Sequence, residues 1–65
     1  MKSYSPREVI KILRRNDWKL DRINGDHYIF RKLGRKYVTV VPISRDTLKV
    51  GTLKNIEKQS GIKFK

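Results

Sequence analysis

Apolar side chains recur with a helical period near the start of the chain, directly after a helix-start signal. Residues 5–8, Ser-Pro-Arg-Glu, combine an N-cap serine, a proline suited to the first helical position and a glutamate that completes a capping box. An apolar stripe follows at Val9, Ile10 and Leu13, while the basic side chains between them fall on the opposite side. The pattern predicts a helix over residues 6–16.

The period then changes to the alternation of strands. Residues 18–23 alternate for four positions, and the pattern slips at Arg22. Asn24-Gly25 follows, a dipeptide typical of a tight hairpin turn whose two central positions both need positive φ. Residues 27–32 and 37–41 are rich in aromatic and β-branched side chains, with a turn at 33–36 between them. We therefore expect three antiparallel strands in a meander.

A loop over residues 42–51 precedes a second predicted helix over 52–60, which ends at Gly61 as a C-cap glycine. The order α-β-β-β-α predicts an α+β fold, formed by a single domain over residues 1–65. Both helices are expected on one face of a three-stranded antiparallel sheet, with the other face in solvent. The predicted core consists of Val9, Ile10, Leu13, Leu53 and Ile56.

Strand alternation links the orientation of His27 to that of two aromatic residues. Tyr28 and Phe30 share one face of their strand, and His27 and Ile29 share the other. If the aromatic pair points inward, His27 and Ile29 face solvent, and the alternation alone leaves the choice open. The strand aromatics Trp18, Tyr28, Phe30 and Tyr37 could stack on bases, although such residues more often form core.

Net charge is the property of the sequence that most strongly indicates the kind of partner. The chain has 17 lysine and arginine residues against six acidic ones, a net charge of +11 that runs through both halves of the sequence. A field of this size attracts polyanions, chiefly nucleic acid, and next an acidic protein; the alternative is a solvated basic surface. The absence of cysteine excludes disulfides and thiolate chemistry, and one histidine with scattered carboxylates predicts no metal site and no cofactor. No apolar run reaches the length of a membrane span and no signal segment is recognised, so we expect a cytoplasmic protein.

His27 is the one side chain suited to proton transfer near neutral pH. A histidine can take the proton of the ribose 2′-hydroxyl while cations neutralise charge on the phosphate, so RNA cleavage without a metal is a compatible chemistry. Asp26 is expected to point to the opposite face of the strand and therefore not to orient His27. The predicted RNA-binding residues are Lys32, Arg35, Lys36 and Lys54.

Several segments, in order, resemble the HicA toxin family: residues 4–13, Asn16-Asp17-Trp18, residues 25–30, residues 51–56 and Gln59-Ser60-Gly61. The resemblance implies a fold like that of double-stranded-RNA-binding domains, an mRNA interferase activity with His27 as the catalytic residue, and an acidic HicB-type antitoxin as partner. Two positions depart from the family pattern. Asp26 stands where the family commonly has serine, and Asp17 where it usually has glycine.

Two other functions stay open at this point. The chain could be a non-catalytic double-stranded-RNA-binding module in which His27 only contacts RNA, or a basic interaction protein whose sole partner is an acidic protein. An antitoxin could either cover His27 directly or bind the outer surface of the first helix, at Lys11, Arg14 and Arg15.

Overall fold

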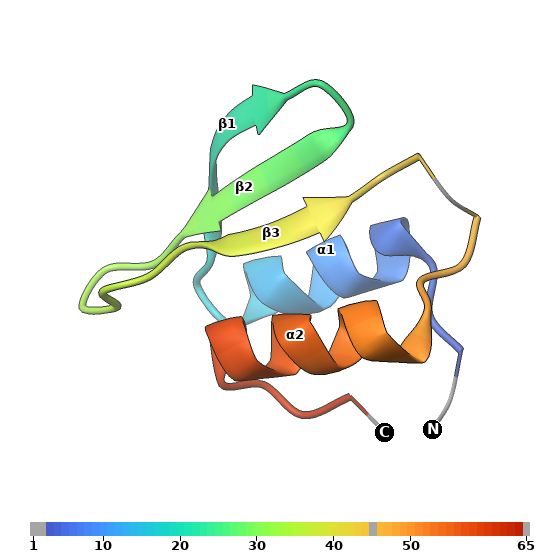
Figure 1. Ribbon diagram of the computed structural model, residues 1–65. Helices are drawn as coiled ribbons and strands as arrows, with labels where there is room; N and C mark the ends of the chain where they lie inside the picture. The colour runs from blue at the N-terminus through green and yellow to red at the C-terminus, as the bar shows by residue number, and fades with distance from the viewer. Residues whose placement is uncertain (1–2, 45, 65) are drawn as a thin grey trace.

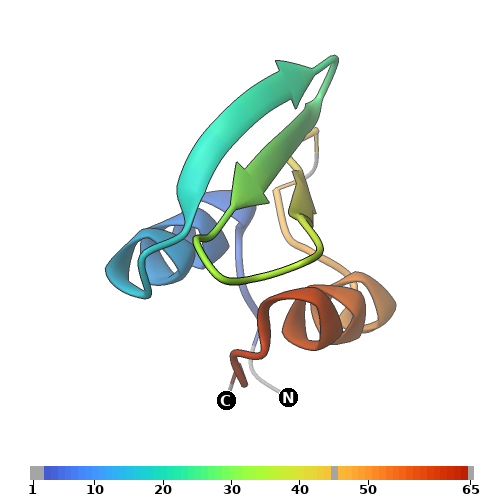
Figure 2. The same ribbon diagram turned by 90° about the vertical axis from the view of Figure 1, so that its left-hand side faces the viewer.

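The computed structural model describes residues 3–44 and 46–64, which form two helices and one sheet (Figure 1). The elements are α1 (Pro6–Arg15), β1 (Lys19–Asn24), β2 (His27–Arg31), β3 (Thr39–Pro42) and α2 (Val50–Ser60). The strands pair antiparallel in the order β1-β2-β3, and both helices lie on one side of the sheet (Figures 1 and 2). The predicted α+β fold and element order are confirmed.

Helix α1 begins with the predicted capping box. The Glu8 N–H donates to Ser5 Oγ at 3.2 Å, and the Ser5 N–H donates to Glu8 Oε1 at 2.8 Å. Pro6 occupies the first turn, where its missing N–H costs no hydrogen bond. These interactions satisfy amide donors that would otherwise lack partners at the helix start.

The end of α1 explains one departure from the family pattern. Asp17 has φ +68°, and among the described residues it is the one non-glycine with positive φ. The Asp17 N–H donates to the Arg14 carbonyl, and the Trp18 N–H donates to the Leu13 carbonyl. This is the double hydrogen bond of a Schellman motif, whose left-handed position usually holds glycine. The motif turns the chain so that Trp18 packs into the core directly after the helix.

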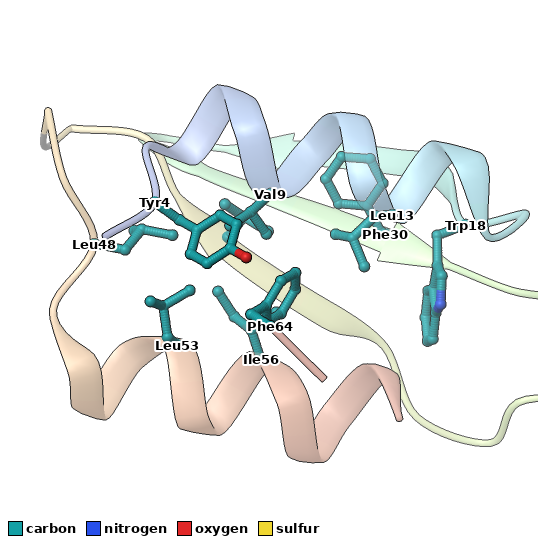
Figure 3. Packing of buried hydrophobic residues seen from close by; sticks show 10 residues of the cluster. Tyr4, Val9, Leu13, Trp18, Phe30, Leu48, Leu53, Ile56 and Phe64 are labelled. Carbon is teal, nitrogen blue, oxygen red and sulfur yellow. The ribbon is translucent and has the colours of Figure 1, made fainter. Parts of the chain in front are cut away.

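The core fills the space between the helices and the facing side of the sheet (Figure 3). The predicted Val9, Leu13, Leu53 and Ile56 are buried there, whereas Ile10 is half-buried. Trp18 and Phe30 are core residues, and Tyr37 is exposed. Leu48 and Phe64, from irregular segments, also belong to this core, and no periodic pattern had indicated them.

Several element boundaries differ from prediction by one or two residues. Helix α2 begins at Val50 rather than at residue 52, so Gly51 lies inside the helix, while Gly61 ends it in the left-handed conformation as predicted. Strand β1 starts one residue late, and β3 covers Thr39–Pro42 rather than 37–41. Neither described helix has the length and apolar run needed to span a lipid bilayer.

The side of the sheet away from the helices, here called the outer face, is open. Tyr28 and Phe30 point toward the helices, so His27, Ile29 and Arg31 belong to the outer face by alternation. Ile29 was expected in solvent if the aromatics point inward, yet only 7% of it is exposed. It lies on the central strand between its cross-strand partners Arg22 and Val40, and such neighbours can cover a side chain without a second layer.

Candidate active site on the outer face of the sheet

The turn between β1 and β2 sets the position of His27, and it differs from the predicted turn. Asn24 pairs with His27, so the two central residues are Gly25 and Asp26 rather than Asn24 and Gly25. Gly25 has φ +63° and Asp26 does not have positive φ. Glycine at the first central position is the mark of a type II′ turn, which matches the twist of the strands. The prediction had the hairpin right and its register wrong by one residue.

His27 is held by the backbone on both sides while its side chain stays accessible. It is the first residue of the central strand and pairs with Asn24 of β1 and with Pro42 of β3. Next to it, the Ile43 N–H donates to the Asp26 carbonyl at 2.8 Å, which ties the turn to the end of β3. The imidazole is 53% exposed. A rigid backbone with an open side chain suits a group that must meet a large substrate.

Asp26 lies beside His27, contrary to expectation. Its Oδ1 is 3.3 Å from His27 Nδ1, and the two side chains are 55% and 53% exposed. The expectation assumed that both residues belong to one strand, but Asp26 is in the turn, where alternation of side chains does not apply. A carboxylate at Nδ1 favours a proton on that nitrogen and leaves Nε2 as the acceptor. Asp26 is thus the carboxylate that faces His27 Nδ1.

The predicted RNA-binding residues are not gathered around His27. Lys32 follows His27 by five residues along an extended strand, a span of about 16 Å. Arg35 and Lys36 lie in the loop between β2 and β3, at the end of the sheet opposite the hairpin turn (Figure 1). Lys54 belongs to α2 in the helix layer, whereas His27 is on the outer face. None of these four cations therefore lies beside His27, and whether they contact RNA remains a prediction.

Arg35 is also engaged within the protein. Its Nη2 donates to the carbonyl of Gln59 at 2.9 Å, near the C-terminus of α2. Its guanidinium lies 5.9 Å from the ring centroid of Trp18, a cation–π distance. Arg35 thus connects the β2–β3 loop to the helix layer, and any RNA contact would compete with these interactions.

Two arginines, Arg22 and Arg31, lie on the outer face with His27, and neither is among the four predicted RNA-binding residues. Arg22 pairs across the strands with Ile29, which makes His27 its diagonal neighbour at about 7–8 Å. Arg31 lies further along β2 on the same face. Asp21 contacts both, at 2.6 Å to Arg22 Nη1 and 3.4 Å to Arg31 Nε.

A bulge places Arg22 on this face. The register shifts between Leu20 and Arg22, so Asp21 is the extra residue and the alternation restarts after it. The slip noted at Arg22 in the sequence was the available signal. The same bulge puts the Asp21 carboxylate between cations that would otherwise repel one another.

A shallow basic groove lies at the far end of the sheet. It has a volume of about 390 Å³ and includes Lys19, Arg31, Lys32 and Arg35 among its lining residues. Among residues 3–44 and 46–64, no group of three or more histidine, aspartate or glutamate side chains could hold a metal ion. The outer face therefore combines one titratable base with a row of cations.

Comparison with known proteins adds one finding. A family model described as the HicA toxin of bacterial toxin–antitoxin systems matches residues 6–62. No curated protein matches the chain. The matched segment contains both helices, all three strands and the Asp26–His27 pair.

Proposed function

The chain belongs to the HicA toxin family, whose model covers all but a few terminal residues, and we propose from that premise that it cleaves RNA with His27 as the general base. The protein is thus a toxin of a toxin–antitoxin system, and HicA toxins are an RNase-type family. Two points go beyond family membership and are proposed here: the substrate is mRNA, and His27 performs the proton transfer. A cytoplasmic location follows from that substrate.

The observation that carries the proposal is the setting of His27. Its backbone is fixed between two strands, its imidazole is open to solvent, and a carboxylate faces Nδ1 at 3.3 Å. A general base must first lie within hydrogen-bonding distance of the proton that it removes, and must then be in a protonation state that can accept it. Asp26 favours the tautomer in which Nε2 is the proton acceptor, so the nitrogen away from the carboxylate is the reactive one.

The reaction needs only groups that the chain and RNA supply. His27 Nε2 takes the proton of a ribose 2′-hydroxyl, and the 2′-oxygen attacks the adjacent phosphorus. The bond from phosphorus to the 5′-oxygen breaks, and that oxygen leaves with a proton from the imidazolium or from water. The products are a 2′,3′-cyclic phosphate and a 5′-hydroxyl. The nucleophile is already part of the substrate, so positioning and charge stabilisation make up most of the catalysis.

Arg22 is the cation best placed to stabilise the phosphate in this reaction, because it is the diagonal neighbour of His27 on the same face. Its Nη1 donates to Asp21 at 2.6 Å, so other N–H groups of its guanidinium would bind the phosphate. Arg31, Lys32 and Lys36 would bind phosphates further along the strand of RNA, toward the basic groove. Arg35 would contribute less, because its guanidinium is already bonded to Gln59. Lys54 would contribute only for an RNA that also reaches the helix layer.

The test is cleavage by the wild type and by His27→Ala, with Asn55→Ala as a control on the exposed side of α2. We expect the His27 variant to keep its circular dichroism spectrum and lose about 10²–10⁴-fold in rate, the range of a single general base. Added imidazole should restore part of that rate, and cleavage by the wild type should survive EDTA. Undiminished cleavage by folded His27→Ala would overturn the assignment.

The same assay separates catalysis from simple binding. If the wild type binds RNA without cutting it, and His27→Ala binds equally well, the chain is a non-catalytic RNA-binding module. If neither protein binds RNA, the positive charge serves a protein partner alone.

We also infer that the antitoxin is an acidic protein of the HicB type. A toxin of this class has an antitoxin partner, and a domain with net charge +11 is complementary to an acidic one. Electrostatic steering would make their association fast at low salt, toward 10⁸–10⁹ M⁻¹s⁻¹. Occlusion of His27 is the simplest route to inhibition, because RNA must reach that side chain.

A further inference from the structure

The two edges of the sheet are not equivalent, because the outer edge of β3 is closed. The Val40 N–H points away from β2 and donates to Gln59 Oε1 of α2 at 3.0 Å. Pro42, two residues on, points the same way and has no N–H. Within the strand Thr39–Pro42, neither outward position offers a donor to a further strand. Proline and covering side chains are common means of closing a strand edge.

The outer edge of β1 is open. All six residues of β1 are exposed, and Figure 2 shows the β1–β2 hairpin extending beyond the helices. The two-residue turn closes on Asn24 and His27, so the backbone groups of Asn24 face β2 and those of Ile23 face outward. Among residues 3–44 and 46–64, no other element bonds to this edge. An edge with unpaired donors and acceptors is a template for another strand.

Apolar side chains accompany this open edge. Leu20 and Ile23 pair with Phe30 and Tyr28, so they share the helix-facing side of the sheet, yet they are 36% and 53% exposed. The helices pack mainly against β3, which is the opposite edge of the sheet from β1. The overhanging hairpin therefore offers an apolar strip beside a row of unpaired backbone groups.

Charge indicates what occupies the edge. Lys19 and Arg22 lie on the outer face of β1, and Arg31 stands opposite Lys19. Asp21 contacts both arginines, so three cations meet one carboxylate here and the edge stays positive. A second copy of this chain would bring another +11 to the same place and align like charges. An extended segment that carries carboxylates would instead meet cations along the outer face of this edge. Charged edge strands reject unspecific partners in this way.

We propose that the antitoxin docks on this chain by adding a strand to the outer edge of β1. The added strand bonds to the outward backbone groups at Ile23, covers Leu20 and Ile23 with apolar side chains, and directs carboxylates to Lys19 and Arg22. The bulge at Asp21 interrupts the regular edge, so pairing concentrates at residues 22–24, beside the hairpin turn. Two strand spacings of about 4.8 Å then separate the partner from β2, close enough to cover His27.

Hydrogen exchange of the complex with the cognate antitoxin tests the proposal. We expect the Ile23 amide to exchange freely in the isolated toxin and to be strongly protected in the complex. Fast exchange of this amide in a saturated complex would overturn the proposal. Protection that rises with the concentration of toxin alone would assign the edge to a second copy and would overturn it equally.

Two matched variants test the same surface through affinity. Ile23→Glu and Leu33→Glu make the same change of charge at exposed apolar residues, but Leu33 lies 99% exposed in the loop at the far end of β2. We expect Ile23→Glu to raise the Kd for the antitoxin about tenfold or more, because it places like charges together, and Leu33→Glu to leave it unchanged. Equal effects would contradict the proposal.

Ile23→Pro tests the backbone pairing directly. It removes the outward N–H at a position where an edge strand tolerates proline. We expect weaker antitoxin binding with RNA cleavage retained. The proposal depends on the antitoxin and not on the cleavage chemistry. A wild type that fails to cut RNA would defeat the proposed function and leave these binding results interpretable.

Discussion

At the scale of single residues, Asp26 separates this chain from its family pattern. A serine in its place would offer His27 a hydroxyl, whereas Asp26 places a carboxylate oxygen 3.3 Å from Nδ1. In the proposed reaction, this carboxylate would act through the imidazole and would not need to touch RNA. Asp26 is therefore a positioning residue in the proposed reaction, and its substitution should change the state of the ring as well as the rate.

We predict that Asp26→Asn lowers the cleavage rate about tenfold, less than the roughly 10²–10⁴-fold contribution of the base itself, because a half-exposed pair is screened by water. In ¹⁵N spectra of His27, the neutral ring should shift from the form with its proton on Nδ1 toward the form with its proton on Nε2. Asp17→Asn removes the same charge far from His27 and should change neither the tautomer nor the rate. An unchanged tautomer in Asp26→Asn would show that the carboxylate does not orient the ring.

The orientation of His27 shows how far single residues could be read from the sequence. Alternation correctly placed it opposite Tyr28 and Phe30, but the inference about Asp26 failed because the hairpin turn begins one residue later than Asn24-Gly25 suggested. The position of Arg22 depended on a bulge, and the sequence showed only a slip in the pattern. Turn register and bulges result from competition between pairings, which local preferences do not decide.

At the scale of elements, the helices were more predictable than the strands. Capping residues and a C-terminal glycine are local signals, and they located the start of α1 and the end of α2. The β3 boundaries and the burial of Ile29 depend on cross-strand neighbours. Leu48 and Phe64 reach the core through irregular segments tied by single bonds, such as the Leu48 N–H to the Tyr4 carbonyl at 2.9 Å. Core residues in such segments do not follow the hydrophobic period of a helix or a strand, so the sequence pattern does not indicate them.

The end of α1 gives a prediction for stability. Asp17 has φ +68°, a conformation that costs non-glycine residues about 1–2 kcal/mol, and its carboxylate lies at the unfavourable end of the helix dipole. Asp17→Gly should raise the free energy of unfolding in urea by about 0.5–1 kcal/mol after the entropy of the unfolded chain is counted. Asp17→Val should lower it by about 1–2 kcal/mol.

Asp46→Gly is the matched control, because Asp46 lies in a loop without positive φ. Glycine there should lower the free energy of unfolding by about 0.4–1 kcal/mol, since it only increases the freedom of the unfolded chain. Opposite signs at the two positions would confirm the role of the left-handed turn. Equal losses at both would contradict it.

At the scale of the whole molecule, the fold shows on which face particular charges lie, whereas the sequence gives only their number and order. The +11 is distributed over the whole chain, but Lys19, Arg22 and Arg31 fall on the outer face with His27, by strand alternation and register. Five residues of strand separate His27 from Lys32, so no compact cluster forms around the histidine. Under the proposed function, an extended RNA strand lying along β2 would reach both His27 and the basic groove.

This arrangement predicts how RNA binding depends on salt. For single-stranded RNA, the logarithm of the affinity should fall linearly with the logarithm of salt concentration, with a slope of about −0.7 for each phosphate neutralised. Arg31→Ala should reduce the slope by about 0.7, because it removes one contact on the outer face. Lys11→Ala changes the charge equally on α1, in the helix layer, and should leave the slope unchanged. Fluorescence anisotropy with a His27→Ala background would measure both without cleavage. Equal slopes for the two variants would mean that RNA does not bind preferentially to the outer face. An affinity that does not depend on salt would mean that the positive charge does not contribute to RNA binding.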